Sequence, residues 1–370
     1  MTPKPLPLDV AGLSIEDGDT RIDRTILGCG TRVLTQTIPA TKSAGISLWV
    51  PVGSRDEGER TAGSTHFLEH LLFKGTNKRS ALDIAVAFDS VGGESNAETA
   101  REHTAYWARV RDADLDMAIE TLTDMVTDSR LDDVDFSMER GVILDELAMG
   151  EDSPTDTVHD AFQLAVHGDR PIGRPVGGTA QAIRDVERAD VWEHYQAHYG
   201  PSSLIVAAAG NVDHESVCER VQAALEGSPW DARSAAAPRP RRDTTVTPIA
   251  DHDKDITRRR DVTQAHVVIG CEGLSATDPA GPTMSVLLSV LGGSMSSRLF
   301  QEVREKRGLA YTTYAFDVAY SDTGTFGMYA GCSPDKVHEV EAIMRAQLED
   351  LAGDGPTEEE MTRVRGQVRG

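Results

Sequence analysis

The chain lacks the features that would place it in a membrane or in a secretion pathway. None of its 370 residues lies in an apolar run approaching the roughly 18 residues that a membrane-spanning helix needs. The N-terminal residues 1–19 are rich in Pro and Asp and have no apolar centre, so they are not a signal peptide. We therefore expect a cytoplasmic protein with no membrane partner.

Cysteine and positive charge are also scarce. The four cysteines are widely spaced and form no Cys-x-x-Cys pair, which indicates reduced thiols rather than a disulfide framework. Lys and Arg number 37 against 60 Asp and Glu, giving a net charge of −23. A nucleic-acid binder needs a basic face, so that class is excluded. The acidic balance suits a well-solvated surface, and it would also attract basic substrates.

The most informative pattern that is present is His66-Phe67-Leu68-Glu69-His70. Residues four apart lie on one face of a helix, so both imidazoles can bind a single metal ion. Glu69 projects from nearly the same face and can act as a general base. This order is the inverted form of the zinc-protease helix.

Paired histidines at helical spacing also occur as ordinary surface or core residues, and a hydrogen-bonded cluster without metal is the alternative here. The flanking residues at 67–68 and 71–73 are apolar, which indicates a buried helix. Buried imidazoles beside a buried carboxylate need compensating partners, and a metal ion would supply them.

A third ligand is needed, because a catalytic zinc usually takes three protein ligands. The strongest candidate is Glu146, on a predicted helix long enough to pack beside the metal-binding helix. Glu139 lies two turns earlier on the same face, where it could orient a ligand. Asp145 is one position off that face and is a weaker candidate.

Hydrophobic periodicity predicts an α+β protein with an internal repeat of element order. In the first half we expect a hairpin over 24–37 and a buried strand at 45–50. A helix after Gly63, capped by Ser64, follows them. Further strands are expected at 94–100, 103–110 and 204–209, and further helices at 80–91, 113–128, 132–150, 153–167, 188–199 and 213–225.

The second half repeats the order strand, two helices, two strands, two helices. Its strands are expected at 258–270, 310–319 and 324–332, and its helices at 279–292, 297–306, 335–352 and 357–369. We expect a disordered segment 1–19, a zinc-binding domain 20–228, a linker 229–246 rich in Pro, Ala and Arg, and a second domain 247–370. The partner of segment 151–228 is missing from the second half, so we expect that domain to be C-terminally truncated.

Several longer motifs resemble the pitrilysin/insulinase family of zinc peptidases, in its shorter, processing-peptidase-like branch. The resemblance covers about residues 20–370. Its most specific stretches are HFLEHLLFKGT at 66–76, ERGVILDE at 139–146 and SSRLFQEVREKRGLAY at 296–311, with further matches at 53–57, 96–97, 104–106, 173–178, 198–201 and 210–213. It implies two related α/β-sandwich domains, each a mixed, largely antiparallel sheet with helices packed on it.

The resemblance also implies a site. His66, His70 and Glu146 carry over as ligands of one Zn²⁺ per chain, Glu69 as the base and Glu139 as an accessory carboxylate. Further residues that match the family's substrate-contacting positions are Arg304, Tyr311, Asn96 and Ala97.

For these further positions the residues alone leave alternatives open. Arg304 could equally be a solvated helix charge, Tyr311 a core residue and Asn96 a turn residue. The chain departs from the family at Glu98, where relatives carry an aromatic or apolar residue. Substrate preference beside that strand is therefore open, and a basic side chain would fit.

The implied activity is that of a zinc metalloendopeptidase acting on extended or unfolded peptides, with a zinc-bound water activated by Glu69. The alternative is a non-catalytic or inactive subunit or fragment of a processing-peptidase-like assembly. The resemblance implies a homodimer or a pairing with a related subunit.

Overall fold

The computed structural model describes residues 10–245 and 254–369 and divides the chain into two compact units. One unit comprises the described chain from residue 10 to Ala148 together with Pro175–Arg241. The other comprises Met149–Arg174 together with the chain from Arg242 onward. The polypeptide therefore leaves the first unit at residue 148, returns to it at 175 and leaves it again after 241.

The first unit is built on a seven-stranded sheet in the order β1-β2-β3-β7-β4-β6-β5. Only the β3–β7 pair is parallel, and every other neighbouring pair is antiparallel. The strands are β1 (Gly12–Asp17), β2 (Thr20–Ile26), β3 (Arg32–Thr37), β4 (Ser43–Val50), β5 (Glu94–Thr99), β6 (Thr104–Arg111) and β7 (Ile205–Gly210). This mixed, largely antiparallel sheet confirms the predicted fold class, and it leaves β5 at one edge.

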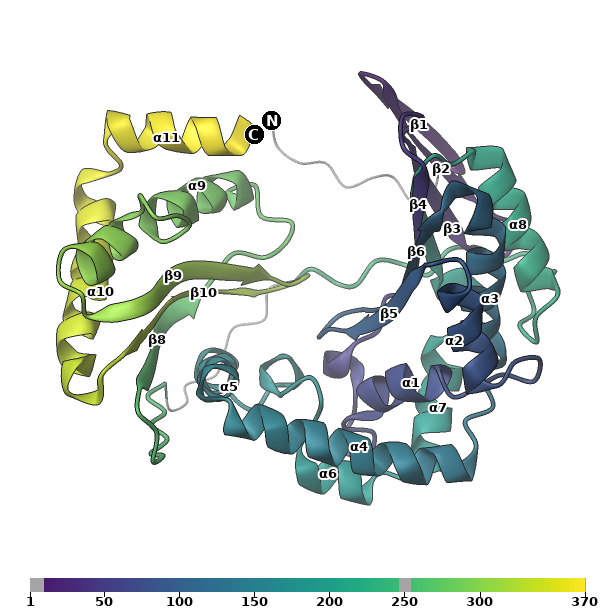
Figure 1. Ribbon diagram of the computed structural model, residues 1–370, viewed down its shortest axis with the longest axis horizontal. Helices are drawn as coiled ribbons and strands as arrows, with labels where there is room; N and C mark the ends of the chain where they lie inside the picture. Colours follow the sequence, from purple (N-terminus) through teal and green to yellow (C-terminus); the bar gives the residue numbers. More distant parts are fainter. Residues whose placement is uncertain (1–9, 246–253, 370) are drawn as a thin grey trace. The chain divides into compact units, whose positions relative to one another are not determined.

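Helices cover one face of this sheet (Figure 1). The helices that contact its strands are α1 (Ser64–Leu72), α2 (Ala81–Asp89), α3 (Leu115–Asp128) and α8 (His214–Glu226). The same unit also contains α6 (Ala180–Asp185), α7 (Arg188–His198) and, up to Ala148, α4 (Asp133–Asp152). Alternate residues of β4 are buried, and Leu48 packs in one core with Phe67 of α1 and Leu122 of α3. The apolar face of α1 is thus part of the main core, which fixes the orientation of its opposite, polar face.

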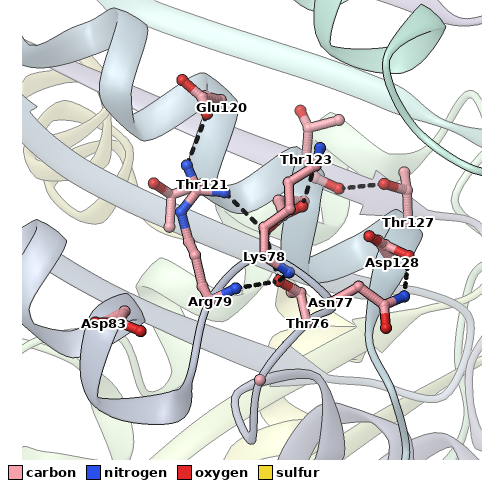
Figure 2. Close-up of polar contacts among 12 residues, drawn as sticks. Thr76, Asn77, Lys78, Arg79, Asp83, Glu120, Thr121, Thr123, Thr127 and Asp128 are labelled. Atoms are coloured by element: carbon pink, nitrogen blue, oxygen red, sulfur yellow. Dashed lines mark hydrogen bonds and ion pairs between the residues drawn. The ribbon is translucent and has the colours of Figure 1, made fainter.

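The loop between α1 and α2 is tied to α3 by ion pairs and hydrogen bonds (Figure 2). The Asp124 carboxylate accepts from Arg79 Nη1 and from Thr76 Oγ1, both at 2.7 Å. Arg79 also donates to Glu120 and Asn77 donates to Asp128, again at 2.7 Å. These contacts fix the chain directly after the metal-binding motif.

The second unit has a three-stranded sheet in the order β8-β10-β9. Its elements are α5 (Pro154–His167), β8 (Ala265–Glu272), α9 (Gly281–Leu291), a π-helical segment (Phe300–Glu305), β9 (Ala310–Ala319), β10 (Gly324–Cys332), α10 (Val337–Asp354) and α11 (Glu358–Arg369). Every residue of β10 is buried. One face packs Met328 against Val340 and Met344 of α10, and on the other face Tyr329 stacks with His159 of α5.

The predicted repeat of element order is present, and it extends to the pairing of strands. In the first unit β6 lies between β4 and β5, and in the second β10 lies between β8 and β9. In both units, therefore, the third strand of the repeat is the central one. The position of β9 in its sheet corresponds to that of β5 in the first.

Some local predictions were wrong. Residues 12–17, expected to be disordered, form β1, while residues 1–9 lie outside the described part of the chain. The strand expected over 258–270 begins only at Ala265, because residues 258–261 are exposed and charged. Ser64 does not cap α1. The cap residue is Gly63, which has no side chain to accept a hydrogen bond.

Candidate metal centre

The site begins with the helix α1, which presents two imidazoles on its polar face. Phe67, Leu68 and Leu71 are fully buried on the other face. This packing turns His66 and His70 to the same side, with their Nε2 atoms 3.3 Å apart. The predicted helix and the predicted convergence of the two histidines are both present.

The backbone N–H groups at the start of α1 donate to a buried carboxylate rather than to the side chain of Ser64. Glu57 accepts from the backbone N–H groups of Gly63 and Thr65, each at 2.7 Å. Gly63 has φ of 88°, a left-handed conformation that glycine adopts without strain. Burial raises the pKa of Glu57 to about 7, although both backbone hydrogen bonds favour the charged form.

Helix α4 brings Glu146 to the two histidines. Its Oε2 lies 3.6 Å from His66 Nε2 and 3.3 Å from His70 Nε2. Among the described residues, His66, His70 and Glu146 form the one group of potential metal-binding side chains, and Asp145 is not part of it.

The three atoms fit a zinc ion. Tetrahedral coordination at about 2.0–2.2 Å places neighbouring ligand atoms about 3.3–3.6 Å apart, and the three separations here are 3.3, 3.3 and 3.6 Å. Burial, and then the neighbouring His70, lowers the pKa of His66 to about 4. The imidazole is therefore neutral at pH 7, the form that binds metal.

Glu139 orients His70 through Nδ1, the ring nitrogen that faces away from the metal position. Its Oε2 accepts from His70 Nδ1 at 2.9 Å, and its Oε1 lies 2.6 Å from Lys74 Nζ. With its Nδ1 donating to a carboxylate, His70 holds the Nε2 lone pair toward the metal position. Glu139 is 3% exposed, so Lys74 compensates a nearly buried charge.

Glu69 lies next to the three metal-binding candidates. Its Oε2 accepts a hydrogen bond from the hydroxyl of Thr99 on β5. Glu69 lines a cavity of about 500 Å³ together with His70, Glu139, Glu146 and Asn96. A carboxylate at this place can accept a proton from a water molecule held in the cavity.

Asn96 and Ala97 lie on the edge strand β5, so the turn alternative for Asn96 is wrong. The side-chain Oδ1 of Asn96 accepts from the backbone N–H of Ala97 at 2.9 Å. Glu98, where the chain departs from the family, is on the same strand with its side chain 63% exposed.

Arg304 and Tyr311 belong to the second unit and lie together there. Arg304 Nη1 donates to the Tyr311 carbonyl oxygen at 3.0 Å, and its guanidinium carbon lies 4.5 Å from the centre of the Tyr311 ring. Tyr311 is 74% exposed, which excludes the alternative of a core residue.

Sequence reasoning missed three contributors to this site: Glu57, Lys74 and Thr99. Lys74 lies in the motif stretch at 66–76, four residues after His70, and that helical spacing was a usable signal. Glu57 and Thr99 act across loops and strands, and no local pattern points to them.

No helix in the described ranges of the chain is both long and apolar enough to cross a membrane.

Comparison with known proteins gives two family matches and close relatives. Residues 32–180 match the family model described as insulinase (peptidase family M16), and residues 185–368 match the one described as peptidase M16 inactive domain. A protein of Streptomyces coelicolor, described as an uncharacterised zinc protease, is 48% identical over 96% of this chain and 77% of its own length. One of Mycobacterium tuberculosis, described in the same way, is 43% identical over 94% and 78%.

The fold has solved counterparts. The crystal structure of a protease from Helicobacter pylori is similar with a TM-score of 0.84. The match covers 95% of this chain and 84% of that one, at 22% sequence identity. At 22% identity, this similarity is evidence for the fold of the chain and not for its activity.

Proposed function

The chain belongs to the insulinase family of peptidases, peptidase family M16, and we propose that it is a zinc-dependent endopeptidase acting on extended or unfolded peptides. The observation that carries the proposal is the convergence of His66, His70 and Glu146 beside Glu69. His66, His70 and Glu146 would hold one Zn²⁺. When bound, zinc supplies Lewis-acid polarisation of a carbonyl group and lowers the pKa of water.

Glu69 is the proton carrier in this proposal. Its carboxylate takes a proton from the attacking water and returns it to the amine of the leaving product. Glu139 and Lys74 keep His70 in one tautomer, so that its Nε2 stays available as a ligand.

The substrate would bind as an added strand on the free edge of β5. Main-chain pairing there, next to Asn96 and Ala97, makes binding tolerant of sequence. The exposed Glu98 would favour a basic side chain at the neighbouring substrate position.

Arg304 and Tyr311 would contribute from the second unit, by stabilising negative charge on the carbonyl oxygen under attack. Their mutual contact supports this role, because it presents an exposed ring beside a guanidinium. We further propose a catalytic domain within 20–228, of which Met149–Arg174 belongs to the second compact unit, a linker 229–246 and a second domain 247–370. A cytoplasmic location and a homodimer, or a pairing with a related subunit, complete the proposal.

The second candidate function is a non-catalytic subunit of a processing-peptidase-like assembly. The match of residues 185–368 to the inactive-domain model favours it for that part of the chain. The complete set of metal-binding and proton-accepting side chains lies in the part that matches the insulinase model, and this favours the enzyme.

Glu69→Gln tests the proposal. The variant should keep about one zinc per chain and lose peptide hydrolysis by a factor of about 100 to 10,000, since an amide cannot accept the proton. Zinc is measured by elemental analysis, and cleavage by digestion of a peptide library with and without chelator. Glu59→Gln, at an exposed loop position before α1, is the matched control and should behave as wild type. Wild-type cleavage rates in Glu69→Gln would contradict the assignment.

A further inference from the structure

Thr99 is a residue of the edge strand that the reaction described above does not use. Its hydroxyl donates to Oε2 of Glu69, and no other side chain among the described residues donates to that carboxylate. We propose that Thr99 is a positioning residue, which holds the Glu69 carboxylate for proton transfer and joins it to the strand on which the peptide docks. This inference rests on the proposed function.

The backbone groups and the side chain of Thr99 point in different directions. The backbone N–H of Ala100 bonds to the His103 carbonyl oxygen in the direction of β6, whereas that of Ala97 is satisfied by the Asn96 side chain. In an antiparallel ladder, alternate residues direct their backbone groups to the same neighbour. The backbone groups of Ser95, Ala97 and Thr99 therefore face the free edge.

The side chain of Thr99 points away from the exposed surface of the strand. Burial alternates along β5, with Glu94, Asn96 and Glu98 exposed and Ser95, Ala97 and Thr99 half-buried. A peptide that pairs with the free edge would thus bond to the backbone of Thr99, while the hydroxyl of the same residue contacts the base. Thr99 would therefore take part both in peptide binding and in the orientation of Glu69.

The hydrogen bond suits the chemistry that Glu69 has to perform. A carboxylate has two oxygens, and a donor on Oε2 leaves Oε1 to accept from water. It also restricts rotation of the side chain, and correct orientation of a base is a large part of its effect. The nearby hydroxyls of Tyr106 and Tyr199 are 3.1 Å apart and bond to each other, so they do not replace Thr99.

Two substitutions separate the hydroxyl from the shape of the side chain. Thr99→Val keeps the β-branched shape that suits a strand and removes the donor, whereas Thr99→Ser keeps the donor. With zinc-loaded protein and a fluorogenic peptide, Thr99→Val should lower kcat about 10- to 100-fold and leave KM within about threefold. Thr99→Ser should recover most of that loss, and zinc content should be unchanged in both.

Thr37→Val is the matched control. Thr37 lies on β3, which is separated from β5 by three strands, and donates its hydroxyl to the Val212 carbonyl oxygen at 3.0 Å. This variant loses a threonine hydrogen bond from the same sheet, and its kcat should stay at the wild-type value. Unfolding midpoints of all three variants show whether the fold is retained.

A second measurement keeps the inference independent of the proposed activity. Crystal structures of zinc-loaded wild type and Thr99→Val should show Glu69 in one side-chain conformer in the first and in several in the second. If wild type cleaves no peptide, the proposed function fails, and the conformers of Glu69 still decide the role of Thr99. A single, unchanged Glu69 conformer in Thr99→Val overturns the inference. So does a kcat that is unchanged in Thr99→Val, or lowered equally in Thr99→Val and Thr99→Ser.

Discussion

At the scale of single residues, the site depends on nearly buried carboxylates whose charge is compensated by a few specific partners. Glu139 is the clearest case, because its side chain is 5% exposed and its two oxygens face His70 and Lys74. Lys74, with 35% exposure, can be exchanged without opening a cavity in the core. It is therefore the residue through which the orientation of His70 can be tested.

Lys74→Met should weaken zinc binding about 10- to 100-fold, as the loss of outer partners of a ligand does. The physical reason is that Glu139 loses its counter-charge and holds the His70 N–H less firmly. Competition with a chelator measures the affinity. Lys74→Arg should retain most of it, and Lys42→Met, at an exposed lysine of the same unit, should have no effect. Equal losses in Lys74→Arg and Lys74→Met would argue against a role for the charge.

His194 should make the first unit sensitive to acid. It is 4% exposed, it contacts Thr65 Oγ1 at 3.0 Å, and burial together with His198 lowers its pKa to about 4. An unfolded histidine has a pKa of about 6.5. The folded state thus favours the neutral ring, and its contribution to stability is complete above about pH 6.5 and is lost as the pH falls toward 4.

Between pH 7.5 and 5, we expect this histidine to lower the free energy of unfolding by about 1–2 kcal/mol. Urea unfolding of metal-free wild type and His194→Gln at both pH values measures the difference. The variant should be less stable at pH 7.5 and should lose less on acidification. Equal losses in the two proteins would show that His194 does not titrate in this range.

At the scale of elements, the loop after α1 is held by a buried acid. The Asp124 side chain is 2% exposed and pairs with Arg79, which is 20% exposed. Without Asp124, Thr76 loses its acceptor and Arg79 keeps only the exposed Glu120 as an ion-pair partner among the described residues. Breaking a buried pair by removing one partner costs several kcal/mol. An exposed pair contributes little, because water already solvates both groups.

Asp124→Ala should therefore lower the free energy of unfolding by about 3 kcal/mol. Asp116→Ala, which breaks an exposed pair with Arg220, is the control and should cost less than about 1 kcal/mol. Chemical denaturation of both variants measures the difference. Comparable losses in the two would mean that the Asp124 pair is no stronger than a surface contact.

The elements also show what local patterns can and cannot predict. Apolar periodicity was enough for the metal-binding helix and for α3, because both place a continuous apolar face in the core. The prediction of Ser64 as the helix cap was wrong, because the backbone donors at the start of α1 bond to Glu57 in a preceding loop. Within the site, His66, Glu69 and His70 follow from spacing alone. Thr99 could not be found in that way, because its contact depends on how β5 lies against α1.

At the scale of the whole molecule, the two units share one order of elements, but the group of potential metal-binding side chains found among the described residues lies in only one of them. The repeat could be predicted from element order, since order survives when sequence similarity is lost. The assignment of Met149–Arg174 to the second unit could not, because it depends on packing between α5 and β8. Nothing in the apolar pattern of α5 specifies which sheet it covers.

Helix α4 has a consequence of its own, because it runs unbroken from Asp133 to Asp152 while the border between the units falls after Ala148. Glu146 therefore lies two residues before that border, in the same unbroken helix as residues 149–152. Folding of the last turn of α4 and occupation of the site are thermodynamically linked, and such linkage acts in both directions. Zinc should slow amide hydrogen exchange in 149–152, although none of these residues is among the three candidate ligands.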